Sequence, residues 1–238
     1  MKNVAIVLAA GSGSRMGGTM KKQFMPLLEK PVLFYSLKAF EESFVDGIVI
    51  VSSGEDIEYV RREIVSKYGF SKVIDVVPGG EERYNSVLCG LRAAGDADYI
   101  FIHDGARALV TVDILERAYE AVQKYDACVI GMPSKDTVKI SDENGMVAST
   151  PNRNCVWTVQ TPQVFRGELI KEAYEDVVSR AGELLKNGVV ITDDAMVLEE
   201  YSGHPVRLVE GSYENIKLTT PEDIYIAEEI LRRRKGNL

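Results

Sequence analysis

Residues 4–16 of the chain read VAIVLAAGSGSRM, an apolar run that opens directly into a glycine-rich segment. The run from Val4 to Leu8 is continuous rather than alternating, which predicts a β-strand covered on both faces. Gly11 and Gly13 predict a loop in which bare backbone N–H groups approach a ligand closely. Such a loop at the carboxyl end of a first parallel strand is where open α/β sheets bind ligands.

The rest of the first half repeats this rhythm of short apolar runs and amphipathic helical stripes. We expect strands at residues 48–51, 73–77, 99–103 and 127–130, with helices over 57–68, 87–94 and 114–122 between them. Strands that alternate with helices favour parallel order and helices on both faces of the sheet. The fold class is therefore α/β, with three layers and a mostly parallel, twisted, Rossmann-like sheet, in a single domain over residues 1–238.

The second half continues with shorter signals. We expect strands at residues 156–159, 206–210 and 215–218, and helices at 167–180 and 192–201. A last helix is predicted to begin at Thr220-Pro221, because Thr is a good cap and Pro suits the first turn.

Residues 133–155 break the rhythm. Two short alternating runs, 137–140 and 146–148, flank a polar segment that contains the turn-forming step Asn144-Gly145. This predicts a β-hairpin with too little apolar surface to stand alone in water. We expect it to project as an arm and to pack on a second copy of the chain, which makes the protein a homodimer.

Composition excludes several classes of protein. The net charge of −8 argues against nonspecific nucleic-acid binding. The longest apolar runs fall far short of the roughly 20 residues that span a bilayer, so no membrane partner is expected. Three widely spaced cysteines suggest neither a disulfide framework nor a metal knuckle, and the first strand leaves no room for a signal peptide. These features favour the cytoplasm.

Two cations, Arg15 and Lys22, follow the glycines. A dinucleotide fingerprint requires a third glycine where Met16 stands, and a P-loop requires a Gly-Lys-Ser/Thr step that is absent. Two cations beside exposed backbone N–H groups suit a triphosphate whose charge builds up during displacement. The alternative is a plain turn with both cations solvated.

Two other strand ends carry polar residues. Gly80 and Ser86 stand where a flat base and a ribose could lie, although acids at a helix start also explain this loop. Asp104 is placed either to bind Mg²⁺, directly or through water, or to hold substrate hydroxyls, and Arg107 is placed to meet a phosphate. His103 is expected to be a core residue rather than a metal ligand.

In these motifs and in their order, the chain resembles the sugar-phosphate nucleotidyltransferases almost from end to end. More narrowly, it is similar to the 2-C-methyl-D-erythritol 4-phosphate cytidylyltransferases of non-mevalonate isoprenoid synthesis. The resemblance implies an enzyme that uses CTP and Mg²⁺ and transfers CMP to a polyol phosphate. Glu81 departs from the aspartate that is typical of the family, which puts a base contact by this side chain in doubt.

The resemblance also implies roles for individual residues. The implied catalytic residues are Arg15, Lys22 and Lys217. The implied CTP contacts are Ala9, Ala10, Gly11, Ser12, Gly13, Gly80, Ser86 and Asp104. The implied acceptor contacts are Arg107, Thr137, Arg153, Thr161 and Thr192, of which Thr137 and Arg153 flank the arm and reach the partner subunit's site. From the residues alone, Thr192 is a helix cap, Thr137 a β-propensity residue and Arg153 a surface cation.

The expected reaction is an in-line displacement in which an acceptor phosphate oxygen attacks the α-phosphorus of CTP. A phosphate monoester is already anionic at pH 7, so catalysis rests on positioning and charge neutralisation rather than on a general base. Two alternatives stay open. One is a ribitol-5-phosphate cytidylyltransferase built on the same plan, and the other is a sensor that binds CTP without turning it over.

Overall fold

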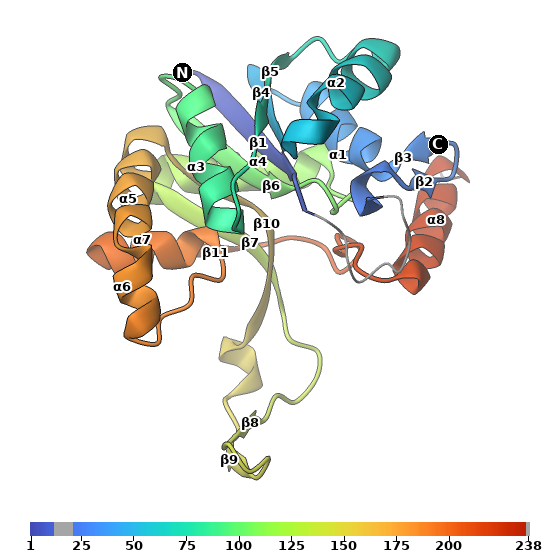
Figure 1. Ribbon diagram of the computed structural model, residues 1–238. Coiled ribbons are helices and arrows are strands. Elements are labelled where there is room, and N and C mark those ends of the chain that lie inside the picture. The colour runs from blue at the N-terminus through green and yellow to red at the C-terminus, as the bar shows by residue number, and fades with distance from the viewer. Residues whose placement is uncertain (12–20, 237–238) are drawn as a thin grey trace.

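A seven-stranded sheet with the order β11-β7-β10-β6-β1-β4-β5 forms the centre of the molecule (Figure 1). The structure, a computed structural model, describes residues 1–11 and 21–236. The strands of this sheet are β1 (Asn3–Ala9), β4 (Gly47–Ser52), β5 (Val73–Pro78), β6 (Tyr99–Asp104), β7 (Ala127–Pro133), β10 (Trp157–Arg166) and β11 (Arg207–Glu210). Two short hairpins accompany it, β2 (Pro26–Leu27) with β3 (Lys30–Pro31) and β8 (Ile140–Ser141) with β9 (Val147–Ser149).

The sheet is mixed but mostly parallel, as the sequence predicted. Parallel ladders join β1 to both β4 and β6, β4 to β5, and β7 to β11. β10 runs antiparallel between β6 and β7. Since the parallel strands end at one edge, the loops after β1, β5 and β6 meet there, which is where an open α/β sheet binds its ligands.

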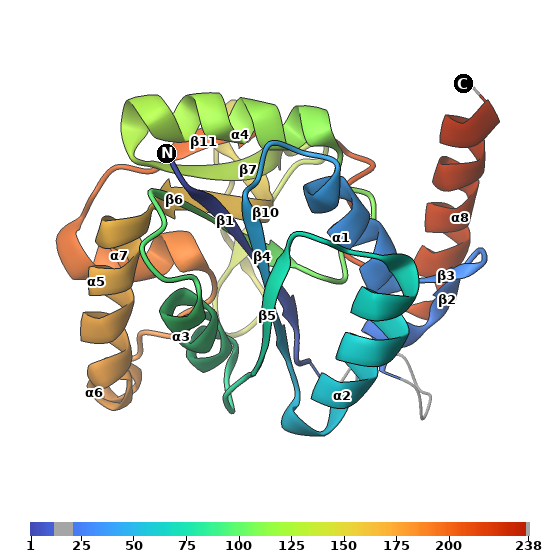
Figure 2. The ribbon, with the colours of Figure 1, turned by 90° about the horizontal axis from the view of Figure 1, so that it is seen from above.

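Helices cover both faces of the sheet (Figure 2). The helices are α1 (Val32–Glu41), α2 (Ile57–Tyr59), α3 (Arg83–Ala93), α4 (Val112–Tyr125), α5 (Gly167–Ser179), α6 (Ala181–Lys186), α7 (Asp194–Ser202) and α8 (Pro221–Gly236). Single-turn helices η2 (Lys22–Phe24), η3 (Gly54–Asp56) and η5 (Arg153–Cys155) and a π-helical stretch η4 (Val60–Ser66) complete the described elements.

The first strand explains why the sheet is covered on both sides. Ala5 and Val7 belong to the core cluster under α1, η4 and α4, whereas Val4 and Ile6 belong to the cluster under α3, α5 and α7. All four side chains are completely buried. Because successive side chains of a strand point to opposite faces, a continuous apolar run needs a helix layer on each side. The predicted three-layer α/β fold is confirmed.

The predicted hairpin is present and projects from the sheet on the extended ends of β7 and β10 (Figure 1). Its first strand, β8, is shorter than the run 137–140 that the sequence suggested. The turn is not a regular two-residue turn, because Asp142 N donates to Met146 O at 2.8 Å and Gly145 N donates to Asp142 O at 3.1 Å. Gly145 alone of the turn residues takes a positive φ, of 79°, so the loop is a turn followed by a left-handed glycine.

Two expectations about the second half were wrong in detail. Residues 215–218 do not form a strand, because their backbone has no ladder partner. They are held instead by isolated bonds, since Asn215 Nδ2 donates to Thr161 O at 3.0 Å, Arg107 Nη1 donates to Asn215 O at 2.8 Å and Leu218 N donates to Ala106 O at 2.9 Å. The cap of α7 is Asp193, whose side chain accepts from Met196 N, and not Thr192.

Candidate active site

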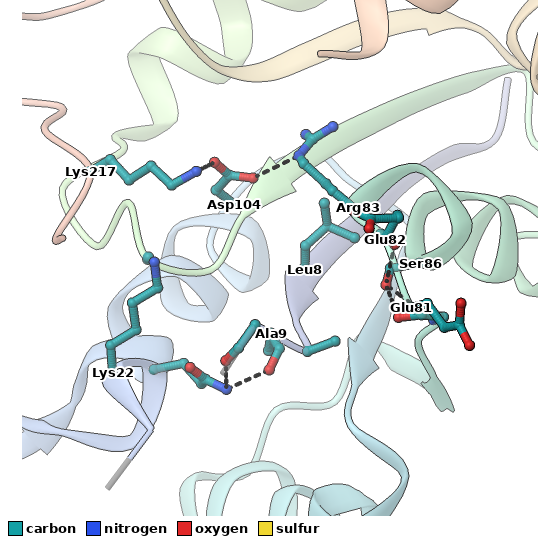
Figure 3. Close-up of a pocket in the computed structure, with 14 residues that line it drawn as sticks. Leu8, Ala9, Lys22, Glu81, Glu82, Arg83, Ser86, Asp104 and Lys217 are labelled. Carbon is teal, nitrogen blue, oxygen red and sulfur yellow. Dashed lines mark hydrogen bonds and ion pairs between the residues drawn. The ribbon is translucent and has the colours of Figure 1, made fainter. Parts of the chain in front are cut away.

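A pocket of about 420 Å³ lies at the carboxyl edge of the sheet (Figure 3). This volume is in the range of small-molecule sites. Residues that line it come from the end of β1, from η2, from the loop before α3, from the end of β6 and from the segment after β11. They include Ala9, Ala10, Gly11, Lys22, Gln23, Gly80, Glu81, Glu82, Arg83, Ser86, Asp104 and Lys217.

The end of β1 is held in place by Gln23, a residue to which the sequence assigned no role. Its amide nitrogen donates to Ala9 O at 2.6 Å and to Gly11 O at 3.2 Å, and the side chain is 2% exposed. These bonds tie η2 to the start of the glycine loop, which brings Lys22 to the pocket. The predicted contacts Ser12, Gly13 and Arg15 lie outside the described residues.

Lys22 and Lys217 line the same pocket although 194 positions of sequence separate them. Figure 3 shows the two ammonium groups entering the hollow from different elements, η2 and the segment after β11. Lys217 Nζ lies 2.6 Å from Asp104 Oδ2. The structure therefore brings together two of the three cations that the sequence singled out.

Asp104 stands between two cations. Lys217 meets one carboxylate oxygen, and Arg83 Nε lies 3.5 Å from the other. Burial alone would raise the pKa of Asp104, but the charges of Arg83 and Lys217 outweigh it and hold the pKa below its usual range. The carboxylate is therefore ionised at neutral pH and faces the pocket, as the ligand of a hard cation must.

The loop before α3 offers bare backbone to the pocket. Gly80 N donates to Ser86 Oγ at 3.1 Å, and a Cβ at Gly79 would come within 2.8 Å of Ala10 Cβ. A capping box between Glu82 and Asn85 fixes the start of the helix. The predicted contacts Gly80 and Ser86 thus form one wall of the pocket, packed directly against the end of β1.

A chain of hydrogen bonds supports Asp104 from behind. Asp104 N donates to Thr161 Oγ1 at 3.0 Å, Thr161 Oγ1 lies 3.0 Å from His103 Nδ1, and His103 Nε2 lies 3.3 Å from Arg107 O. The carbonyl can only accept, so Nε2 carries the proton and Nδ1 accepts from the hydroxyl. Burial lowers the pKa of His103 to about 4, which keeps the ring neutral. His103 is a core residue, as expected.

The predicted acceptor contacts are not gathered in the pocket. Thr161 belongs to the series of hydrogen bonds that supports Asp104. Both terminal nitrogens of Arg107 donate to backbone carbonyls, those of Asn215 and Val159. Thr137 and Arg153 lie exposed on the arm, where Arg153 Nη1 donates to Lys135 O at 3.3 Å. Thr192 is exposed at the start of α7, with its hydroxyl 3.6 Å from Met196 Sδ.

Sequence reasoning missed Arg83. Its two terminal nitrogens bind Asp194 Oδ1 and Oδ2 at 2.7 and 2.8 Å, while its Nε faces Asp104. One signal pointed to it, because a cation in the first turn of a helix opposes the helix dipole. A residue that breaks a local rule in this way often serves a site.

The fold and this site together define the class of protein to which the chain belongs. A glycine loop after the first strand, converging lysines and an ionised aspartate at the end of β6 are the features of an α/β nucleotidyltransferase, in which cations and backbone hold a nucleoside triphosphate.

Comparison with known proteins narrows this class to a family. The family model described as "IspD: 2-C-methyl-D-erythritol 4-phosphate cytidylyltransferase" matches residues 3–233, so the chain belongs to this family. The protein of that name from Lachnoclostridium phytofermentans is 50% identical over 98% of both chains. The one from Lachnospira eligens is 47% identical over 97% of this chain and 99% of its own.

Comparison with solved structures supports the same family. The 4-diphosphocytidyl-2C-methyl-D-erythritol synthase of Anaerococcus prevotii has a TM-score of 0.82 and 32% identity, covering 97% of this chain and 98% of its own. The Francisella tularensis 2-C-methyl-D-erythritol 4-phosphate cytidylyltransferase has a TM-score of 0.77 and 28% identity, covering 96% and 99%.

Proposed function

We propose that this protein transfers CMP from CTP to 2-C-methyl-D-erythritol 4-phosphate, giving 4-diphosphocytidyl-2-C-methyl-D-erythritol and pyrophosphate. The observation that carries the proposal is the meeting of Lys22, Lys217 and Asp104 in one pocket, in a chain of this family. An oxygen of the acceptor phosphate forms a bond to the α-phosphorus of CTP as the bond to the pyrophosphate oxygen breaks.

The described residues of the pocket suit this displacement. The two reactants are anions that repel each other, so cations on both sides lower the cost of bringing them together. Lys22 and Lys217 supply such cations, and the bare backbone of the loop at Gly80 leaves room for the nucleoside. The acceptor phosphate needs no base to become a nucleophile, since it is already ionised.

Asp104 is the residue that would hold Mg²⁺, directly or through water. Among the described residues, no group of three or more His, Cys, Asp or Glu side chains is arranged around a metal position. One carboxylate together with substrate phosphates is nonetheless a usual Mg²⁺ site. When bound, the ion would neutralise charge on the triphosphate.

We propose that the arm joins two copies of the chain. Its apolar side chains Ile140, Met146 and Val147 are 52%, 68% and 61% exposed, so within one chain they lie mostly uncovered. A partner that covers them would also receive Thr137 and Arg153, which in this proposal contact the acceptor in the partner subunit's pocket. A monomer mass in light scattering at working concentration would contradict the proposal.

We place the reaction in the cytoplasm. The three cysteines, all within the described part of the chain, are free thiols, which suits a reducing compartment. No helix among residues 1–11 and 21–236 is long and apolar enough to span a bilayer.

The test is pyrophosphate release from CTP across a panel of polyol phosphates. We expect release with 2-C-methyl-D-erythritol 4-phosphate to exceed release with ribitol 5-phosphate by orders of magnitude in kcat/KM. A preference for ribitol 5-phosphate would show that ribitol 5-phosphate is the acceptor. CTP binding without pyrophosphate release on any acceptor would show that the protein is a sensor. UTP and ATP are the control nucleotides.

A further inference from the structure

Arg83 joins two walls of the pocket that are far apart in sequence. It is the first residue of α3, beside the loop that carries Gly80, and its guanidinium holds Asp194, the first residue of α7, with two parallel hydrogen bonds of 2.7 and 2.8 Å. The remaining nitrogen, Nε, is turned toward Asp104 at 3.5 Å (Figure 3). Such a fork fixes the direction of the whole guanidinium plane.

Asp194 is an anchor and not a substrate ligand, because its side chain is completely buried. The hydroxyl of Tyr174 donates to one of its oxygens. Gln163 Oε1 accepts from the backbone nitrogens of Asp194 and Ala195 at 3.0 and 2.8 Å, which fixes the first turn of α7. Because these hydrogen bonds fix the position of Asp194, they also determine where the guanidinium of Arg83 lies.

Holding α3 in place does not require this pair, in which Asp194 is fully buried and the side chain of Arg83 is 32% exposed. Arg92, on the same helix, makes an equivalent fork to Glu175 of α5 with bonds of 2.9 and 2.8 Å, and both side chains of that pair are more than half exposed. A buried ion pair contributes little net stability, since the desolvation of both charges offsets their attraction. The position of Arg83 beside Asp104 therefore calls for a reason other than packing.

We infer that Arg83, clamped by Asp194, is a positioning residue that fixes the carboxylate of Asp104 against Lys217 and sets α7 at a defined place beside the nucleotide wall. The inference rests on the proposed cytidylyl transfer. Asp194 accepts from both terminal nitrogens of Arg83 and Asp104 faces the third nitrogen, Nε, so the ion pairs of this guanidinium join two carboxylates and Arg83 acts on the reaction through Asp104.

Three variants test this inference. Arg83→Met leaves a buried carboxylate without its cation, which lowers the melting temperature and slows turnover together. Arg83→Met combined with Asp194→Asn removes both charges, so the melting temperature returns toward that of the wild type. Arg92→Met deletes the matched exposed fork on the same helix and is the control.

The double variant separates positioning from folding. We expect its kcat to stay on the order of 10²-fold below wild type, the usual cost of losing one preorganised polar group. Its KM for CTP should change by less than about threefold, because the bonds between Gly80 and Ser86 remain. Arg92→Met should keep wild-type kcat. Turnover, KM and thermal denaturation are measured on the full-length protein.

Two outcomes overturn the inference. A double variant with a wild-type melting temperature and kcat within about twofold of wild type means that Arg83 serves only folding. A double variant that melts as low as Arg83→Met means that the unpaired carboxylate is not what destabilises the single variant. If the wild type itself releases no pyrophosphate with any acceptor, the proposed function fails instead, which keeps the two failures distinguishable.

Discussion

The pocket and the arm are held together in opposite ways. In the pocket, charged side chains are paired across long stretches of sequence, as between Arg83 and Asp194, which are 111 positions apart. In the arm, beyond the contacts that its base makes with Tyr213, the bonds are local, such as that from Lys139 to Thr150 over 11 positions and that from Asn144 N to Asp142 over two. The pocket therefore depends on the whole fold, whereas the arm depends on itself and on whatever covers it.

This difference between pocket and arm corresponds to the two substrates of the proposed reaction, CTP and the acceptor. Those groups assigned to CTP that the structure describes lie in the pocket of one chain, while Thr137 and Arg153, assigned to the acceptor, lie exposed on the arm. In the proposed dimer, nucleotide binding is a property of one subunit and acceptor binding is a property of the pair. Each of the following predictions acts on one side of this division.

The largest effect is expected for Lys22→Ala, which removes a pocket cation. Turnover should fall on the order of 10²–10³-fold with the fold intact, by analogy with the loss of one preorganised donor. Pyrophosphate release and circular dichroism measure the two quantities. Lys38→Ala, which alters an exposed lysine of α1 that pairs with Glu42, is the control. Near-normal turnover of Lys22→Ala would remove this residue from the catalytic set.

The hydrogen-bond chain behind the pocket predicts a pH dependence of stability. Burial holds the pKa of His103 at about 4 in the fold, against an ordinary value of 6.5, so the unfolded chain binds more protons between these values. Stability is full above pH 6.5 and falls as the pH drops toward 4, by about 3 kcal/mol. Urea unfolding at several pH values measures it, and His103→Gln should flatten this part of the profile. An unchanged profile in His103→Gln, with His204→Gln as control, would contradict the assignment.

Gly80→Ala should weaken CTP binding about tenfold, or 1.4 kcal/mol. A Cβ at Gly80 would overlap the Cβ of Asn85, so the loop must shift away from its position against the end of β1. Gly54→Ala is the matched control, because a Cβ there meets nothing within 4 Å. Calorimetric titration with CTP is the measurement. Equal affinities of the two variants would show that this loop does not hold the nucleotide.

The smallest effect concerns the arm. Arg153→Ala should raise the KM for the acceptor several-fold and leave CTP binding unchanged, because the guanidinium lies outside the pocket of its own chain. Steady-state kinetics with each substrate varied in turn measures the difference. A raised KM for CTP with an unchanged KM for the acceptor would contradict the division between pocket and arm.

Mixing variants sharpens this test. If the arm of one subunit completes the pocket of the other, a hybrid of Lys22→Ala and Arg153→Ala has one intact site and one doubly altered site. At acceptor concentrations well below KM, where Arg153→Ala alone is slowed several-fold, the hybrids in a mixture refolded together should contribute about a quarter of wild-type turnover, since about half of random dimers are hybrids and each has one intact site of two. No gain over the separately refolded variants would place both residues in the same subunit's site.

Much of the fold was predictable because its signals are local. The continuous run from Val4 to Leu8 indicated a strand buried on both faces, and Asn144-Gly145 indicated the hairpin. Residues 215–218 were mistaken for a strand, because a short apolar run near a sheet looks the same whether or not a ladder partner is available. The segment is held by isolated bonds to Thr161, Arg107 and Ala106, and no periodicity reports such contacts.

The sequence by itself determined the layered sheet, the glycine loop after its first strand and the cation Lys22 that follows this loop, since strand burial, glycine loops and charge are read from neighbouring residues, whereas Lys217 was singled out only by the family resemblance. Only the tertiary structure decided that Lys217 pairs with Asp104, that Thr161 lies behind that carboxylate, and that Arg83 is clamped by Asp194. Those pairs join residues from separate elements, so they exist only once the strand order places their ends side by side.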